Sequence, residues 1–140
     1  MQVIVLAFNW NESLATGNTQ IDTQHKQLFN AINELLKACK SRHGQTSLDS
    51  TMQFLIDYTH EHFGEEEKLQ QHYHYPDYNN HKKIHDSFKL SIEELAKNLK
   101  AEGPTALLIT KITSNTGDWL INHIHLQDKK VAAHIHAKSK

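Results

Sequence analysis

The chain has 140 residues, a hydrophobic fraction of 38% and a formal net charge of −1 at pH 7, so we expect a single domain over residues 1–140. No block of Lys and Arg residues marks a face for nucleic acid or acidic lipid. The apolar run near the start, Val3 to Phe8, is much shorter than the roughly 20 residues of a membrane-spanning helix, so we expect a cytoplasmic protein without nucleic-acid or membrane partners.

Residues 1–18 carry no helical pattern, and we expect a short arm that lies against the rest of the protein through Phe8 and Trp10. The first helix is predicted to begin at the capping box Thr19-x-x-Asp22 and to end near Gly44. Its inward positions recur at steps of three and four residues: Ile21, His25, Leu28, Phe29, Ile32, Leu35, Leu36 and Cys39. Cys39, at the end of this stripe, is interpreted as a small core residue.

The second helix is predicted to follow Thr46 and Ser47, which are candidate N-caps, and to end before Tyr75-Pro76. Its inward stripe consists of Leu48, Met52, Leu55, Tyr58, His62, Glu66 and Leu69. Gly64 lies inside this helix, where glycine costs about 1 kcal/mol relative to alanine.

The third helix is predicted to be capped by Asp77 and to stop at Gly103-Pro104. Its inward stripe consists of His81, Ile84, His85, Phe88, Ile92, Leu95 and Leu99. Pro104 is expected to open the fourth helix, which the weak helix formers from Ser114 to Gly117 are expected to bend. The fourth stripe consists of Leu107, Leu108, Ile112, Trp119, Leu120, His123 and Ile124.

Four amphipathic helices with short connections predict an all-α fold, an antiparallel up-down-up-down four-helix bundle with a short N-terminal arm. We expect the bundle to cover about residues 19–136 and the end, from Ala137 to Lys140, to fray.

The sequence holds 12 histidines but a single cysteine, so a metal site here would use nitrogen and oxygen ligands. The pairs His62-x-x-x-Glu66 and His81-x-x-x-His85 each share one helix face, because four residues make about one turn. With His25 and His123 they fall at one end of an alternating bundle, where a bound cation would offset their burial. Asp128 follows His123 by five residues, about 140° around a regular helix, so we expect a distortion there.

The other titratable residues of these segments are interpreted as solvated. Glu65 and Glu67 are expected to lie on an exposed face beside Glu66. The same holds for the histidines outside the pattern, which are His43, His60, His72, His74, His125, His134 and His136.

The ordered set of seven resembles the ligand signature of the hemerythrin family, and the resemblance runs from Trp10 to about Lys130. Flanking residues agree with it, including Ile21 to Phe29 around His25, Tyr58-Thr59 before His62-Phe63, Tyr75-Pro76-Asp77-Tyr78 before His81-Lys82, and Trp119-Leu120 before Asn122-His123. The likeness suggests a stand-alone bacteriohemerythrin.

The resemblance implies a cofactor of two iron ions bridged by an oxo or hydroxo group. In that family pattern one iron takes His81, His85 and His123, the other takes His25 and His62, and Glu66 and Asp128 bridge them. The iron with two histidines keeps a vacant position for dioxygen, in a pocket walled by Leu120 and Trp119 with Phe29 and Phe63 as neighbours. Val131 stands where the family usually has tyrosine, so any hydrogen bond from that position is lost.

The resemblance therefore implies reversible dioxygen binding for carriage, storage or scavenging, rather than an enzyme. Two alternatives stay open: a module that senses dioxygen or nitric oxide, and a diiron oxidase or peroxidase. Oxygen-activating diiron bundles usually carry Glu-x-x-His on two helices, and this motif is absent from the sequence. The oligomeric state is left open, with a monomer favoured.

Overall fold

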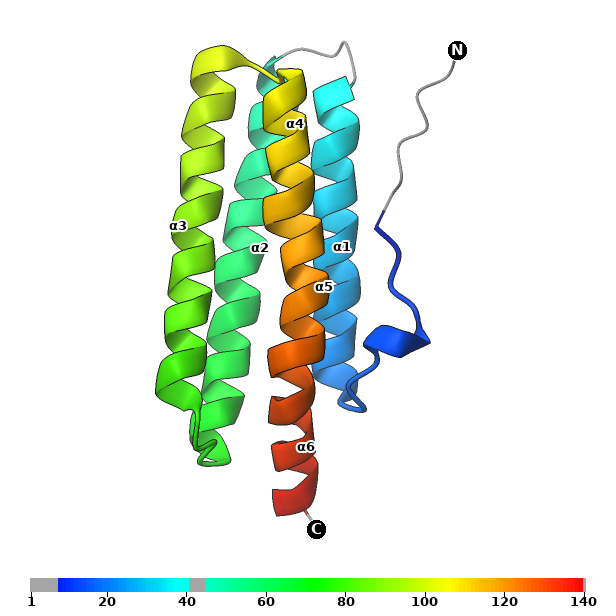
Figure 1. The fold of residues 1–140 in the computed structure, drawn as a ribbon, viewed down its shortest axis with the longest axis vertical. Coiled ribbons are helices and arrows are strands. Elements are labelled where there is room, and N and C mark those ends of the chain that lie inside the picture. Colours follow the sequence, from blue (N-terminus) through cyan, green and yellow to red (C-terminus); the bar gives the residue numbers. More distant parts are fainter. Residues whose placement is uncertain (1–7, 41–44, 140) are drawn as a thin grey trace.

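The computed structural model describes residues 8–40 and 45–139, and these form four helical rods without any strand. Three rods are single helices: α1 (Thr19–Lys40), α2 (Gln45–His72) and α3 (Tyr78–Glu102). The fourth contains α4 (Ala106–Ile112), α5 (Trp119–His123) and α6 (Lys129–Lys138). The rods run alternately up and down (Figure 1), which confirms the predicted all-α, antiparallel bundle.

Asn18 caps the first helix, one residue before the predicted cap. Its side-chain Oδ1 accepts the N–H of Ile21 at 3.0 Å, and Thr19 is already helical. Asp22 accepts the N–H and the hydroxyl of Thr16 at 2.9 and 2.8 Å, which ties the incoming chain to the first turn. The predicted capping box between Thr19 and Asp22 is therefore wrong, because Asn18 is the cap and Asp22 bonds to Thr16 instead of Thr19.

The other N-terminal caps also differ from prediction. Helix α2 begins at Gln45, so Thr46 and Ser47 lie within its first turn. Asp77 occupies the N-cap position of α3 without a side-chain capping bond. Thr105, not Pro104, precedes α4 and accepts the N–H of Leu108 at 3.1 Å.

Of the predicted C-terminal ends, the one at Gly103 is confirmed. Gly103 ends α3 with a φ of +75°, a conformation that favours glycine. Helix α1 ends at Lys40, and its predicted stop near Gly44 lies outside the described residues. Helix α6 includes Ala137 and Lys138, so it passes the predicted end at residue 136.

Two π-helical segments interrupt the fourth rod, at Thr113–Asp118 and Ile124–Asp128. The first coincides with the weak helix formers at which a bend was predicted. The second separates His123 from Asp128, where the five-residue spacing predicted a distortion. The predicted distortion before Asp128 is thus confirmed as a wider turn, and a second wider turn occupies the place of the predicted bend; such turns are frequent at functional sites.

Two apolar clusters fill the bundle. The larger includes buried residues of all four rods, among them Leu35, Leu55, Phe63, Ile92 and Leu120. The smaller lies towards the start of α1 and consists of Ile21, Val131, Ala132 and Ile135, with Leu69, Tyr73 and Tyr75 packed against it. Along α1 and along the fourth rod, the histidines of the sequence pattern lie between residues of the two clusters.

The described part of the N-terminal arm, residues 8–18, packs against the bundle through Phe8 and Trp10, as predicted. Asn33 of α1 holds the backbone of Phe8, donating to its carbonyl at 2.7 Å and accepting its N–H at 2.8 Å. The Phe8 ring stacks on Phe29 and covers Gly117 so closely that a Cβ at this glycine would collide with the ring.

Within the described residues, no helix combines the length and the apolar character needed to cross a bilayer. Cys39 is buried in the larger cluster, which confirms its predicted core position. Burial raises the pKa of this thiol, so the thiolate that reacts with oxidants is disfavoured.

The two helical glycines in contrasting surroundings give a test of this packing. A Cβ at Gly64 would meet no atom within 4 Å, so Gly64→Ala should raise the free energy of unfolding by about 1 kcal/mol through helix propensity. Gly117→Ala should lower it, because the methyl group displaces Phe8. Urea denaturation followed by circular dichroism in one fixed metal state measures both changes.

Phe8→Ala supplies the control for the second substitution. In that background Gly117→Ala should lose most of its penalty, since the colliding ring is gone. An equal penalty with and without the Phe8 ring would contradict the proposed packing.

Candidate metal centre

Seven imidazole and carboxylate side chains from the four rods meet inside the bundle. Helix α1 supplies one residue, α2 and α3 supply two each, and the fourth rod supplies two, around its second π-helical segment. Six of them are 0–1% exposed and His123 is 4% exposed; the set is His25, His62, Glu66, His81, His85, His123 and Asp128. Because neighbouring rods run in opposite directions (Figure 1), the early parts of α1 and α3 and the late parts of α2 and the fourth rod, which hold these residues, fall at the same end of the bundle.

The ligand atoms form two overlapping clusters, each with all its atoms within 4.8 Å of one another. One cluster contains His81, His85 and His123, and the other contains His25 and His62. Glu66 and Asp128 belong to both. This arrangement suits two neighbouring cations that share a pair of carboxylates.

The two carboxylates reach imidazoles on opposite sides of the centre. Asp128 lies 2.8 Å from His25 Nε2 through one oxygen and 3.0 Å from His123 Nε2 through the other. Glu66 lies 2.8 Å from His81 Nε2 through Oε1 and 3.6 Å from His62 Nε2 through Oε2. Each carboxylate therefore offers one oxygen to each cluster.

Many of these buried atoms lack a partner in hydrogen-bond geometry despite the short separations. Both carboxylate oxygens of Asp128 are in this state, as are the Nε2 atoms of His25, His62 and His81. Close approach without hydrogen-bond alignment is expected when atoms converge on a common third point. Imidazole nitrogens and carboxylate oxygens are ligands that iron accepts, so the donor set fits a metal-binding site.

The pKa values of the two carboxylates also indicate that the centre suits a cation. Burial and the neighbouring Asp128 raise the pKa of Glu66 well above its usual value. Burial opposes ionisation of Asp128 too, but His123, His25 and His81 hold its pKa well below the usual value. One carboxylate is thus ionised at the expense of the other, and a cation would allow both to be charged.

The imidazoles also differ from one another. Burial, together with His123 and His81, lowers the pKa of His85 to about 2. Burial alone would lower the pKa of His81, but the adjacent Asp128 and Glu66 carboxylates raise it to about 9. Because a metal ligand must be neutral imidazole, cation binding has to displace the proton that His81 otherwise holds.

Three side chains around the centre were missed by the sequence analysis. Glu67 was interpreted as exposed, but it is 9% exposed and accepts a hydrogen bond from His85 Nδ1 at 2.8 Å. Gln24 accepts one from His62 Nδ1 at 2.6 Å. Gln70 is buried and donates to Glu66 at 3.3 Å.

Two of the missed residues share a feature of the sequence. Gln24 adjoins His25 and Glu67 adjoins Glu66, so each reaches a histidine on a neighbouring helix from a position one residue beside the inner stripe. A single helix periodicity places such residues on the flank and does not show which neighbour they meet. Burial raises the pKa of Glu67, while Lys89 and Lys82 of α3 oppose that rise.

Aromatic rings hold two of the imidazoles in place. Phe63 stacks on His85 with ring centroids 3.8 Å apart, and Trp119 stacks on His123 at 4.5 Å. Phe63 is fully buried, whereas Trp119 is half-buried. Leu120 and Phe29, which complete the predicted apolar wall, are buried in the same large cluster.

The smaller cluster closes the other side of the centre. Val131 is fully buried there, and Tyr75 packs against the same cluster. The Tyr75 ring also lies edge-on to His81, with centroids 6.3 Å apart. Valine at position 131 therefore has aromatic and aliphatic neighbours in place of a hydrogen-bonding role.

The remaining histidines mostly agree with their interpretation as solvated. The exposed ones are His60, His72, His74, His125 and His136, while His43 lies outside the described residues. His134 differs, because it is half-buried and its Nε2 lies 2.7 Å from the Tyr73 carbonyl.

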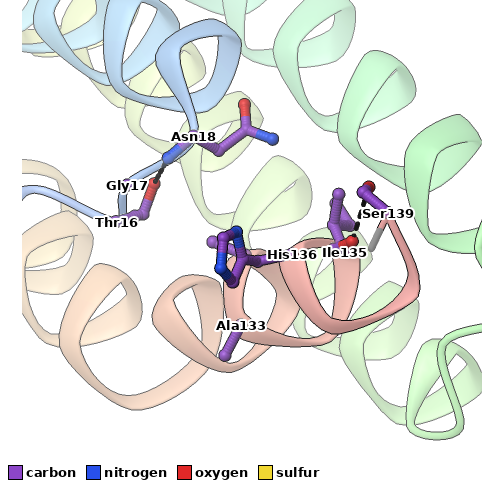
Figure 2. Close-up of a pocket in the computed structure, with 8 residues that line it drawn as sticks. Thr16, Gly17, Asn18, Ala133, Ile135, His136 and Ser139 are labelled. Atoms are coloured by element: carbon purple, nitrogen blue, oxygen red, sulfur yellow. Dashed lines mark hydrogen bonds between the residues drawn. The ribbon is translucent and has the colours of Figure 1, made fainter.

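A groove of about 440 Å³ lies between the start of α1 and α6, away from the seven converging side chains. Figure 2 shows His136 among its lining residues. The Asn18 N–H donates a hydrogen bond to the Thr16 hydroxyl, and the Ser139 hydroxyl donates one to the Ile135 carbonyl. None of the seven converging residues lines this groove, so it is not an entrance to the centre.

Comparison with known proteins agrees with the geometry. Residues 16–135 match the family model described as the hemerythrin HHE cation binding domain. A hemerythrin-like protein of Naegleria gruberi is 33% identical over 123 residues, which cover 88% of this chain and 89% of that protein. A bacteriohemerythrin of Pseudomonas aeruginosa is 32% identical, with coverage of 85% and 75%.

A solved structure extends the likeness to three dimensions. A crystal structure of a hemerythrin variant with leucine replaced by tyrosine superimposes with a TM-score of 0.80. It is 27% identical, and the match covers 93% of this chain and 98% of that one. From the family model, these relatives and the convergent buried centre, we conclude that the chain belongs to the hemerythrin family.

Proposed function

We propose that this protein binds dioxygen reversibly at a pair of iron ions. In this proposal His81, His85 and His123 hold one ion, and His25 and His62 hold the other. Glu66 and Asp128 bridge the two ions, and an oxo or hydroxo group completes the bridge. The observation that carries the proposal is the pair of buried ligand clusters that share both carboxylates.

The family supports binding over catalysis, since hemerythrins are oxygen-binding proteins rather than enzymes. When bound, a pair of ferrous ions would supply the two electrons that dioxygen takes up and would regain them on its release. The protein's own task is to hold these ions apart from water and from reducible or oxidisable substrates. Carriage, storage and scavenging share this chemistry, and the cytoplasmic location and monomeric state stay predictions.

The residues around the centre serve that task in different ways. Phe63 and Trp119 fix the planes of His85 and His123 by stacking, so these ligands are held before a metal arrives. Leu120, which is 1% exposed, lies three residues before His123 in α5 and adds an apolar surface. In the proposal this apolar wall excludes water and protons from the position where dioxygen binds, which slows irreversible oxidation of the iron ions.

The proposal is tested by loading the protein with ferrous iron without air and then admitting dioxygen. A new absorption band in the visible region should appear and should disappear when dioxygen is removed under vacuum. A module that senses dioxygen would show the same reversible band, and only a change in its partner contacts between aerobic and anaerobic conditions would distinguish it. Decay coupled to oxidation of a substrate supports the oxidase, and a spectrum indifferent to air contradicts reversible binding, dioxygen sensing and the oxidase.

Glu66→Ala should prevent the binding of a full pair of iron ions, because it removes an oxygen from both clusters at once. Metal analysis of anaerobically loaded protein should give no more than one iron per chain. Glu65→Ala removes a carboxylate from the same helix but outside both clusters, and it should keep the full complement. Two irons and an unaltered spectrum in Glu66→Ala would contradict the bridging role.

Leu120→Ala should open the apolar wall and speed the decay of the oxygenated form severalfold. The decay is measured from the visible band at constant temperature and pH. Leu108→Ala is the matched control, since Leu108 is also buried in the fourth rod, 3% exposed, but lies three turns away from Leu120. Both variants lose roughly 2–5 kcal/mol of stability, so equal decay rates in the two would refute a specific role for Leu120.

A further inference from the structure

Two of the converging histidines are held from outside by different kinds of acceptor. His85 donates its Nδ1–H to the Glu67 carboxylate at 2.8 Å, and His62 donates its Nδ1–H to the Gln24 amide oxygen at 2.6 Å. In both, Nε2 points inward and lies 3.5–3.6 Å from an oxygen of Glu66. The two histidines belong to different ligand clusters.

The Glu67 acceptor is held in place by its neighbours. Its side chain is 12% exposed and lies 2.8 Å from His85 Nδ1. Burial raises the pKa of Glu67, and Lys89 and Lys82 of α3 oppose that rise. Asp86, which lies 2.9 Å from Lys82 Nζ, anchors one of these lysines. The His85 ring cannot turn away from Glu67 without breaking its stack on Phe63, whose plane is tilted from it by only 2°.

A carboxylate and an amide affect an imidazole differently. An ionised acceptor draws the Nδ1 proton more strongly, which increases the electron density on Nε2 and makes it a stronger metal ligand. A neutral amide fixes the ring with a smaller electronic effect. A stronger ligand stabilises the higher oxidation state of the ion that it holds.

From this asymmetry we infer that Glu67 is a positioning residue that makes the two metal positions unequal in reduction potential. An iron ion held by His81, His85 and His123 loses its electron at a lower potential than one held by His25 and His62. The inference rests on the diiron site of the proposed function, but not on dioxygen binding.

The test is anaerobic spectroelectrochemistry of the iron-loaded protein, in which a soluble mediator accepts one electron at a time. Glu67→Gln keeps the hydrogen-bond acceptor and removes its charge. It should weaken the preference for the ferric state about tenfold, an upward shift of the first oxidation step by about 59 mV for a one-electron couple.

Two further variants separate the acceptor effect from a general charge effect. Gln24→Glu places a carboxylate next to His62 and should lower the potential of the second oxidation step. The difference between the two potentials then becomes smaller. Glu65→Gln removes the same charge from the same helix and should leave both steps in place. An unmoved first step in Glu67→Gln, or an equal shift in Glu65→Gln, overturns the inference.

Zinc loading gives a second measurement that needs neither iron chemistry nor dioxygen. The Nδ1–H proton resonance of His85 should lie downfield of that of His62 in the zinc protein, and Glu67→Gln should move only the His85 resonance upfield. Coincident resonances in the unmodified protein would refute the inference. A failure of the proposed function, seen as iron-loaded protein that does not bind dioxygen, leaves both of these measurements interpretable.

Discussion

The structure depends on the burial of ionisable groups in the middle of an apolar bundle. Two carboxylates and five imidazoles lie between two hydrophobic clusters, and six of these seven side chains are essentially inaccessible to water. An unpaired buried charge costs several kcal/mol after relaxation. Since Glu66 and Asp128 cannot both ionise easily without a cation, metal binding and stability of the bundle are coupled.

The fold and the convergence of the seven side chains followed from sequence periodicity. His25, His62 and His85 occupy inner stripes of amphipathic helices, and alternating helix directions bring their heights together. The five-residue interval before Asp128 was informative because it does not fit a regular helix, and the π-helical segment there accommodates it. A helical periodicity recurs along a whole segment, so each residue that fits it strengthens the prediction for the others.

Each contact that the sequence analysis missed involves one pair of residues and does not belong to a periodic pattern. Asn18 replaced Thr19 as a cap because both residue types are acceptable caps and only the backbone decides between them. Glu67 lies one residue from Glu66, on a flank of α2 that faces solvent or α3 depending on how the two helices are rotated. Composition favoured an exposed carboxylate, whereas the neighbouring His85 made a buried one favourable.

The second π-helical segment also sets the rotational phase of everything that follows it. With its extra residue, α6 presents Val131, Ala132 and Ile135 to the smaller cluster. Deleting one residue between His123 and Asp128 would turn the downstream helix by about 100°. The deletion would move the Asp128 carboxylate out of both ligand clusters and would expose Val131, Ala132 and Ile135. The ligand clusters and the apolar packing at this end of the bundle therefore depend on the same inserted residue.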